Sequence, residues 1–394
     1  MWEKKDLQKK YDVVIIGAGV HGLAIAYYLA KRGITNVAVL DKSYIGGGNS
    51  GRNTQIFRSN YRTPESIKYY NEALLLYENL TQELDYNLLI DQCGNLALGH
   101  TEFAMEGLML RAQTSRALGL DTRIIDLKEI KDLVPAINIS RNVRHPIEGG
   151  LYQPKAGNIR HDAVVWGLAY KCTQMGVEIH PHTEVTSIIL KDQKINAVVT
   201  NKNTVKTDTV VNATAGWCST ISQMVGLKLP LTTIPLQACI TEPLKPFMNM
   251  VMMSVNLHAY FYQTARGEVV LGAEIDPYAS YSHVSTLPTL EDMCKSVLEI
   301  MPCLSNVNIL RQWTGICDIT PDFSPIIGTV PNIEGLILDV GTGTWAFKTA
   351  PASGKEIAEL IDTGKTPDII KPFSITRFYE NDLIDEKGAA GTAH

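Results

Sequence analysis

The chain has 394 residues, of which 45% are hydrophobic and 20% are charged. One hydrophobic core does not usually grow to this size, so we expect two domains. The formal net charge of -5, with no basic run, gives no electrostatic footprint for nucleic acid or for an anionic membrane. A small-molecule enzyme or a subunit of a protein complex fits these bounds.

The strongest local signal lies near the N-terminus. Four apolar residues, 13–16, precede a glycine turn, and an apolar helix follows it. A strand, a glycine turn and a helix start in this order bind the pyrophosphate of a dinucleotide. Gly17 allows the tight turn, Gly19 lets the backbone approach phosphate, and Gly22 allows the helix to pack closely on the strand.

The same motif predicts two further contacts. The backbone of Val20 and His21 opens the helix toward the pyrophosphate. Apolar residues 37–40 form the next strand and end at Asp41, about twenty residues after the glycines, where a carboxylate accepts hydrogen bonds from the adenosine ribose. Together these features favour a bound dinucleotide over a βαβ unit without a ligand.

The apolar run near the N-terminus does not predict a membrane span or a signal peptide. Gly17, Gly19, His21 and Gly22 interrupt it, and no small-residue cleavage site follows. The seven cysteines are an odd number without a C-x-x-C pair, a pattern typical of reduced thiols rather than of disulfides or zinc ligands. We therefore expect a cytoplasmic protein without a bound metal or a membrane partner.

Further along the chain, helical and strand patterns alternate. Thr63 and Pro64 form a helix start, and apolar residues then repeat at helical spacing. Between about 96 and 147, short strands and a charged helix over 102–118 indicate an excursion into a second domain. Gly149-Gly150 predict a turn at its end.

The remaining elements are predicted from the spacing of apolar residues and from the positions of glycines and turn residues. Residues 231–271 are rich in strands, with a hairpin across Arg266-Gly267, and a buried strand at 335–341 enters a second glycine turn over 341–348. The other predicted elements are helices at 163–176, 290–301 and 353–362, a helix from Trp217, and strands at 184–190, 195–200, 209–216 and 309–313.

These elements predict an α/β fold. We expect a Rossmann-like dinucleotide-binding domain and a discontinuous α+β substrate domain with a mostly antiparallel sheet. The predicted bounds are 10–82, 150–228 and 325–372 for the first domain, 83–149 and 229–324 for the second, and 373–394 for a C-terminal tail.

A glycine turn near each end of the chain, the second beside Lys348, and a strand-rich insert between them identify a family. The chain resembles the flavin amine oxidases of the D-amino-acid oxidase type, and among them the β subunits of heterotetrameric sarcosine oxidases. The segments that carry the resemblance are 46–61, 157–167, 341–348 and 383–394.

The resemblance implies two flavins. FAD would bind tightly but non-covalently to this chain, and FMN would be joined covalently through His161 at the interface with a larger α subunit. Small subunits would complete the complex, and tetrahydrofolate would bind in the partner. Bond formation requires a neutral imidazole, which attacks the electron-poor methyl carbon of the flavin ring.

Two departures from the monomeric members bear on the cofactor. Those members tether FAD through a cysteine just before a Thr-Pro-Asp segment, which is Thr320-Pro321-Asp322 here. The matching position is Gly315, and Cys317 follows on the same strand face. The monomeric members also place an oxygen-activating lysine over FAD. At the matching position, within residues 268–272, this chain offers only apolar side chains. The resemblance therefore implies that oxygen reacts at FMN.

The resemblance also implies a substrate site. Arg58 and Lys348 would clamp the carboxylate of a secondary amine such as sarcosine, and both are the predicted catalytic residues. The predicted FAD contacts are Gly17, Gly19, Val20, His21, Gly22, Asp41, Asn49, Arg52, Thr54, Val185, Gly341, Gly343 and Lys348.

Other interpretations stay open at this stage. Within the enzyme class these are the β subunit of a dye-linked L-proline dehydrogenase, an opine dehydrogenase, a hydrogen cyanide synthase or a free-standing amine oxidase. In another class, the chain is a flavin-bearing electron-transfer subunit whose partner holds the substrate. The sequence does not decide between sarcosine, proline and dimethylglycine.

Overall fold

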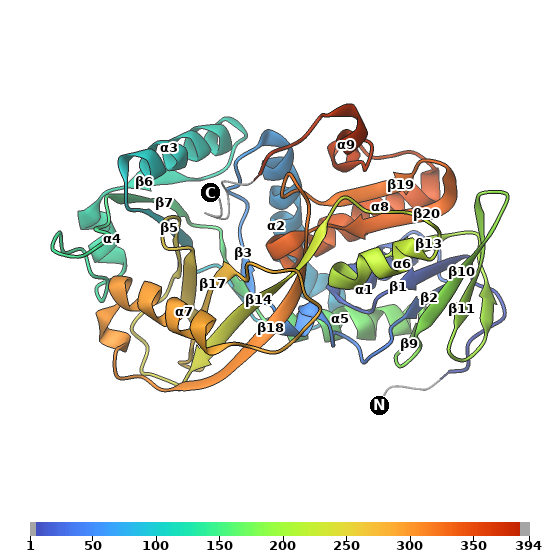
Figure 1. The fold of residues 1–394 in the computed structure, drawn as a ribbon, viewed down its shortest axis with the longest axis horizontal. Helices are drawn as coiled ribbons and strands as arrows, with labels where there is room; N and C mark the ends of the chain where they lie inside the picture. The colour runs from blue at the N-terminus through green and yellow to red at the C-terminus, as the bar shows by residue number, and fades with distance from the viewer. Residues whose placement is uncertain (1–4, 387–394) are drawn as a thin grey trace.

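The computed structural model describes residues 5–386, with the backbone alone for 273–275. Two large sheets lie side by side, one of nine strands and one of eight (Figure 1). A three-stranded sheet of β3 (Ile56–Phe57), β8 (Gly157–Ile159) and β4 (Ile90–Asp91) lies near the centre.

The nine-stranded sheet carries the first glycine turn. Its central strands run parallel in the order β20-β13-β1-β2-β9, with β10 and β11 beyond β20. Parallel strands are buried on both faces, and Val13 and Ile15 of β1 accordingly enter one apolar cluster while Val14 and Ile16 enter another. The strands are β1 (Val13–Ile16), β2 (Val37–Leu40), β9 (Glu178–His180), β10 (Val185–Lys191), β11 (Lys194–Thr200), β12 (Thr204–Lys206), β13 (Val210–Asn212), β19 (Ile326–Val330) and β20 (Ile333–Val340).

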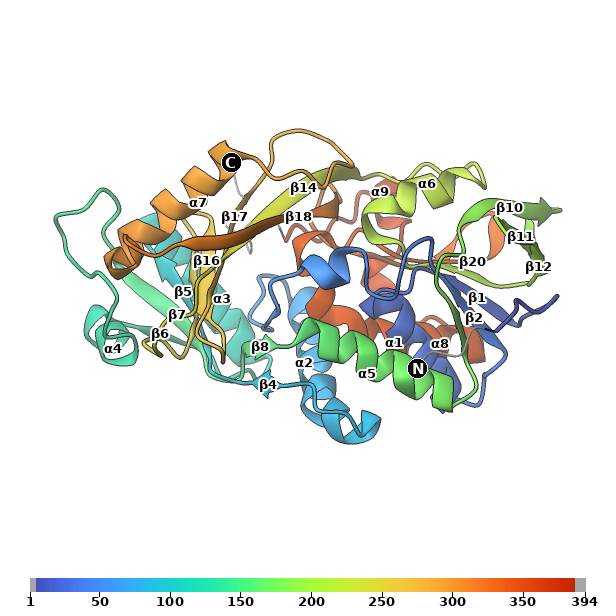
Figure 2. The same ribbon diagram turned by 90° about the horizontal axis from the view of Figure 1, so that it is seen from below.

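Helices cover both faces of this sheet. On one face, α1 (Val20–Lys31) packs on α5 (His161–Gln174) and on α8 (Ala350–Thr363), and α2 (Pro64–Leu84) packs on α8. The short α6 (Cys218–Gln223) lies on the other face (Figure 2). The dinucleotide helix α1 is therefore enclosed, as its nearly all-apolar sequence requires.

Helix α2 begins as the sequence predicts. Its cap is Thr63, whose side-chain oxygen accepts a hydrogen bond from the Ser66 N–H at 3.4 Å, and Pro64 is its first residue. Proline fits this position because its missing N–H would have no helical partner there. The predicted apolar face is buried, through Ile67, Tyr70, Leu74, Tyr77 and Leu80.

The eight-stranded sheet has the order β18-β14-β17-β16-β15-β5-β7-β6 and is antiparallel except where β15 meets β5. The predicted hairpin across Arg266-Gly267 is confirmed, because β16 and β17 pair directly and Gly267 has a positive φ of 100°. The strands are β5 (Asn95–Gly99), β6 (Arg123–Ile125), β7 (Gly149–Gln153), β14 (Thr232–Thr241), β15 (Val251–Ser254), β16 (Ala259–Gln263), β17 (Val269–Ile275) and β18 (Ile309–Ile319).

Two predictions about this sheet are wrong. Gly149 and Gly150 form no turn but begin β7, so the strand crosses the boundary placed at residue 150. The glycines are needed for packing, since a Cβ on Gly149 would lie 2.8 Å from the Met105 methyl carbon. Strand β18 also continues past Trp313 to Ile319, because β14 pairs with it along this whole length.

The described part of the C-terminal tail is fixed by a buried ion pair. Arg377 donates from Nε and Nη2 to the Asp322 carboxylate at 2.8 and 3.1 Å. Glu386 is fully buried and accepts hydrogen bonds from the backbone N–H groups of Arg62 and Thr63, at 2.5 and 3.1 Å. The rest of the predicted tail, 387–394, lies outside the described residues.

The remaining elements are α3 (Glu102–Ala117), α4 (Leu127–Leu133), α7 (Leu287–Ile300) and α9 (Arg377–Glu380), with the 3-10 helices η1 (Asn49–Arg52), η2 (Ala215–Trp217), η3 (Pro302–Leu304), η4 (Gly343–Thr349) and η5 (Lys371–Phe373).

Candidate active site

The first glycine turn tolerates no side chains. A Cβ on Gly17, whose φ is 110°, would lie 2.5 Å from the Ala213 carbonyl oxygen. A Cβ on Gly22 would lie 1.9 Å from the Gly17 carbonyl oxygen. At the start of α1 the Val20 N–H donates to Ser50 Oγ at 2.8 Å, so η1 holds the N-terminus of the helix. Sequence reasoning missed Ser50.

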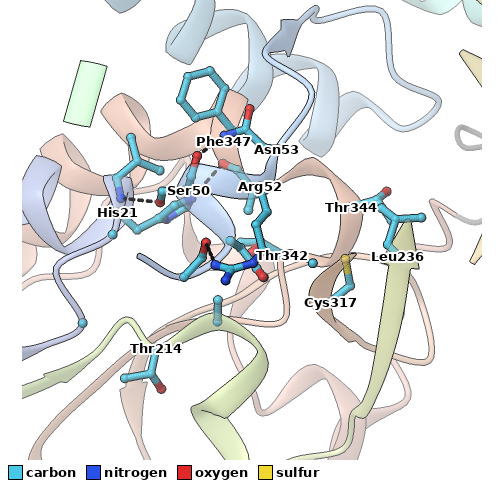
Figure 3. Close-up of a pocket in the computed structure, with 18 of the residues that line it drawn as sticks. His21, Ser50, Arg52, Asn53, Thr214, Leu236, Cys317, Thr342, Thr344 and Phe347 are labelled. Carbon is cyan, nitrogen blue, oxygen red and sulfur yellow. Dashed lines mark hydrogen bonds between the residues drawn. The ribbon is translucent and has the colours of Figure 1, made fainter. Parts of the chain in front are cut away.

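A cavity of about 540 Å³ opens from this turn and extends between the two sheets. Figure 3 shows side chains from separate elements around it, among them His21, Arg52, Thr214, Cys317 and Thr342. Of the predicted site residues, the cavity is lined by Gly17, Gly19, Val20, His21, Asp41, Asn49, Arg52, Thr54, Arg58, Val185, Gly343 and Lys348.

Three predicted residues lie outside the cavity lining. Gly22 packs against Gly17 and Ile15, so its role is steric. Gly341 packs against Thr320, and a Cβ at this position would lie 2.7 Å from the Thr320 methyl carbon. His161 lies on α5, away from both glycine turns in the chain, and is described separately below.

Asp41 stands at the end of β2, where the sequence placed it, but its carboxylate is engaged by this chain. Oδ2 accepts a hydrogen bond from the Ala18 N–H at 2.8 Å, and Oδ1 accepts one from the Ser43 N–H at 2.7 Å. Burial raises the pKa of Asp41 above its ordinary value, and these two backbone donors oppose that rise. Each oxygen keeps a second lone pair, so the ribose contact stays a prediction.

The predicted loop contacts Asn49 and Arg52 shape the cavity wall. The Asn49 side chain pairs with the backbone of Ile316 in β18, accepting its N–H at 2.9 Å. Arg52 donates to the carbonyl oxygens of Gly47 and Gly48, the second at 2.9 Å. The Asn49 side chain therefore joins the loop after β2 to the eight-stranded sheet, and the Arg52 side chain closes that loop on itself.

Two cations lie in the cavity wall. Arg58, only 1% exposed, follows β3 and donates from Nη1 to Asn60 Oδ1 at 3.0 Å, with its guanidinium 4.3 Å from the Tyr61 ring centre. Lys348 belongs to η4 and is 9% exposed. Burial, and then the like charge of Arg58, hold the pKa of Lys348 well below its usual range. Such a pair can bind a carboxylate, which would relieve the repulsion.

A third buried cation, Arg111, was missed by the sequence analysis. Arg111 of α3 donates to the Asn60 carbonyl oxygen from Nε at 3.2 Å and from Nη2 at 2.7 Å. Burial and the neighbouring Arg58 lower the pKa of Arg111 to about 9. The available signal was its place on the apolar face of a predicted helix, in line with Leu108 and Ala112.

The second glycine turn is held by buried polar groups. Gly341 and Gly343 have positive φ values of 68° and 57°. The Gly341 N–H donates to Asp318 Oδ2 at 2.6 Å, and burial raises the pKa of Asp318 to about 6. Trp345 of the same turn lines the cavity and meets Tyr61 edge-on, with 5.3 Å between ring centres.

His161 is the first residue of α5, two residues earlier than the predicted helix start. Its Nδ1 is buried without a hydrogen-bond partner. Burial, followed by the charges of Arg160 and Arg311, lowers the pKa of His161 to about 4, against the opposing effect of Asp162. The imidazole is therefore neutral near pH 7 and has the nucleophilic nitrogen that bond formation requires.

Gly315 and Cys317 both line the cavity. Burial, and then Asp318, raise the pKa of the Cys317 thiol, so it stays protonated at neutral pH. A thiol is a far weaker nucleophile than a thiolate.

Comparison with known proteins gives the family. A model of the FAD dependent oxidoreductase family matches residues 12–360. The chain belongs to this family. It is 40% identical to sarcosine oxidase subunit beta of Rhodobacter capsulatus, with 100% of this chain and 94% of that protein covered. It is also 40% identical to sarcosine oxidase subunit beta of Arthrobacter sp, with 100% and 97% covered.

Solved structures of the FAD dependent oxidoreductases agree with this fold. L-proline dehydrogenase from P. horikoshii superposes with a TM-score of 0.90 at 29% identity, covering 96% of this chain and 100% of that chain. Glycine oxidase from Geobacillus kaustophilus gives a TM-score of 0.85 at 22% identity, with 94% and 99% covered. The predicted family and fold class are confirmed, and with them an FAD-dependent oxidoreductase.

No helix in the described part of the chain is both long enough and apolar enough to cross a membrane. Across residues 5–386, no three or more His, Cys, Asp or Glu side chains are grouped so as to hold a metal ion.

Proposed function

We propose that this chain is the substrate-oxidising β subunit of a heterotetrameric sarcosine oxidase. Sarcosine would give glycine and a one-carbon unit, as formaldehyde or methylenetetrahydrofolate, and the electrons would reach oxygen as hydrogen peroxide. The observation that carries the proposal is the pair of buried cations, Arg58 and Lys348, in the wall of the dinucleotide cavity. The relatives named sarcosine oxidase subunit beta support it.

The residues of the cavity fit FAD. The first glycine turn leaves space that a Cβ would fill, and the N-terminus of α1 suits a pyrophosphate. When bound, FAD supplies the two-electron acceptor and FMN the onward route to oxygen. The protonated Cys317 and the missing side chain at Gly315 support non-covalent attachment of FAD.

The contribution of this chain is position and charge. The planar fork of Arg58 and the point charge of Lys348 would bind the substrate carboxylate and so fix the N-methyl carbon relative to the flavin. The same two cations oppose a protonated amine, which lowers the amine pKa and favours the reactive neutral form. Trp345 adds an apolar wall to the substrate space.

His161 fits a covalent FMN. Its Nδ1 is buried without a partner, and its pKa of about 4 keeps the ring neutral. Neutral imidazole is the form that attacks an electron-poor carbon. In the proposed assembly this position faces the larger α subunit, small subunits complete the complex, and tetrahydrofolate binds in the partner.

Subunit naming among the relatives supports an assembly of several chains. For location we propose the cytoplasm, since all seven cysteines are free and reduced thiols are typical of that compartment.

Two experiments test this function. Anaerobic addition of sarcosine to the assembled enzyme should bleach the FAD absorbance, and Arg58→Met should prevent this at the same sarcosine concentration. Unchanged absorbance in the parent enzyme would instead favour an electron-transfer subunit without a substrate site. Acid precipitation followed by peptide mass analysis should find FMN on the His161 peptide.

A second candidate is the β subunit of a dye-linked L-proline dehydrogenase. The observation in its favour is the TM-score of 0.90 to an L-proline dehydrogenase. Both substrates are secondary amines with a carboxylate, so the same clamp would serve either. Faster anaerobic bleaching by L-proline than by sarcosine would select this candidate.

A further inference from the structure

One side chain joins the two glycine turns. His21 lies in the first turn of α1, directly after the dinucleotide turn, and its Nδ1 is 2.7 Å from Asp339 Oδ2 at the end of β20. Its Nε2 is 2.7 Å from the carbonyl oxygen of Ala346, in the turn that carries Lys348. The ring is thus in contact with both sides of the cavity, and it is 8% exposed.

The geometry fixes the protons on this ring. A carbonyl oxygen only accepts hydrogen bonds, so Nε2 must carry a proton. A carboxylate also only accepts, so Nδ1 must carry one too, which makes the ring an imidazolium. Burial lowers the pKa of His21, but Asp339 by charge and hydrogen bond, then Ala346 and Asp318, outweigh burial and the net pKa is raised.

The groups around the ring reinforce this arrangement. The second oxygen of Asp339 accepts from Ser353 Oγ of α8 at 3.1 Å, and Ser353 also contacts the Tyr69 hydroxyl of α2 at 2.5 Å. Thr349 donates to the same Ala346 carbonyl oxygen at 2.8 Å. The His21 ring with its contacts to Asp339 and Ala346, called the His21 strut below, is therefore held by α2, α8 and β20 as well as by α1.

We propose that His21 is a positioning residue, a doubly protonated imidazole that ties the dinucleotide turn to the Lys348 turn and makes FAD binding and substrate-carboxylate binding depend on one side chain. The effect on substrate-carboxylate binding rests on the proposed function, which gives Lys348 its role. The link between the two turns and its effect on FAD binding concern only this chain and its nucleotide.

The chain offers a matched control for each end of the strut. Ser50 accepts the Val20 N–H and so steadies only the dinucleotide turn. Tyr77 donates its hydroxyl to the Phe347 carbonyl oxygen at 2.7 Å and so steadies only the Lys348 turn. Neither contact carries a charge.

The first test is the protonation state of His21 in the wild-type holoenzyme. With ¹⁵N-labelled histidine, His21 should show both ring nitrogens protonated at pH 7, and its signal is the one lost in His21→Gln. A neutral tautomer with one bare nitrogen would overturn the proposal. If the variant does not fold, contacts of the ring protons with Asp339 and Ala346 assign the signal in the wild type instead.

The second test compares three variants by FAD dissociation constant and by binding of acetate, a simple carboxylate, read from the FAD spectrum. One charged hydrogen bond is worth about tenfold or more in an equilibrium constant. His21→Gln should weaken both by about tenfold, Ser50→Ala should weaken FAD alone, and Tyr77→Phe should weaken acetate alone. A His21→Gln effect on one ligand only, or on thermal stability only, would refute the coupling.

Acetate separates this proposal from the proposed function. If sarcosine and L-proline both fail as substrates while FAD and acetate respond as described, the function is wrong and the strut stands. If sarcosine is oxidised normally by His21→Gln with unchanged KM and unchanged FAD affinity, the strut is wrong and the function stands.

Discussion

Replacing Lys348 by methionine should weaken substrate binding and stabilise the protein at the same time. Lys348 is 9% exposed beside Arg58, and burial with that like charge lowers its pKa well below the usual range. A hydrogen bond to a charged group contributes about 1.5–3 kcal/mol, so KM for sarcosine should rise about tenfold to a hundredfold. Methionine keeps the length and apolar volume of the stem, and removing a buried charge of this kind should raise the free energy of unfolding by about 1 kcal/mol or more.

The sign of the pH dependence follows from the lowered pKa. Between the folded-state pKa of Lys348 and its ordinary value of 10.5, the unfolded chain holds a proton that the folded chain has lost. Stability therefore rises with pH across this window in the wild type, and Lys348→Met should lack that part of the slope.

Steady-state oxidation of sarcosine gives KM, and urea unfolding of the protein at several pH values gives the free energy of unfolding. Lys365→Met, at an exposed lysine, is the control and should change neither. An unchanged KM in Lys348→Met, or a lower free energy of unfolding, would refute the assignment of Lys348 as a buried carboxylate ligand.

Three further variants test other parts of the structure. Gly22→Ala places a Cβ 1.9 Å from the Gly17 oxygen, so we expect loss of FAD and about 2–3 kcal/mol of destabilisation in urea, while Gly107→Ala, with open space around it, should change stability by less than about 1 kcal/mol. Arg377→Met breaks the buried pair with Asp322 and should cost about 3–5 kcal/mol in the same assay. Burial raises the pKa of Asp322 but Arg377 outweighs it, so this stability is present above pH 3.8 and is lost as pH falls through the lower folded-state pKa; a wild type and an Arg377→Met protein with equal acid midpoints would contradict it. Acid should release FAD from Cys317→Ser as it does from the wild type. If acid releases FAD from Cys317→Ser but not from the wild type, FAD is bound through a thioether to Cys317 and the prediction is wrong.

Local features of the fold could be predicted because their causes lie close together in the chain. The strand, glycine turn and helix around Gly17, the cap of α2 at Thr63 and the hairpin at Gly267 each depend on sterics or hydrogen bonds within a few residues. Arg58 and Lys348 could be named only through the family resemblance, since neither stands in a pattern that predicts chemistry by itself.

Other features could not be predicted because distant segments decide them. Gly149 predicts a turn in isolation, but in the structure it is a strand residue whose missing side chain makes room for Met105. Strand β18 continues past Gly315, a residue type that is disfavoured in strands, because β14 pairs with it. Arg111 reaches Asn60 only once α3 has folded over the loop after β3.

By itself, the sequence determined the nucleotide-binding turn, the alternation of helices and strands, and through family resemblance the flavin and its two cations. Tertiary structure alone decided that the pKa of His21 would be raised and that the pKa values of Lys348 and His161 would be lowered. The reason is that steric and capping rules act between neighbours in the chain. A charge in a protein interior, by contrast, is set by burial and by ionised groups that only folding brings together.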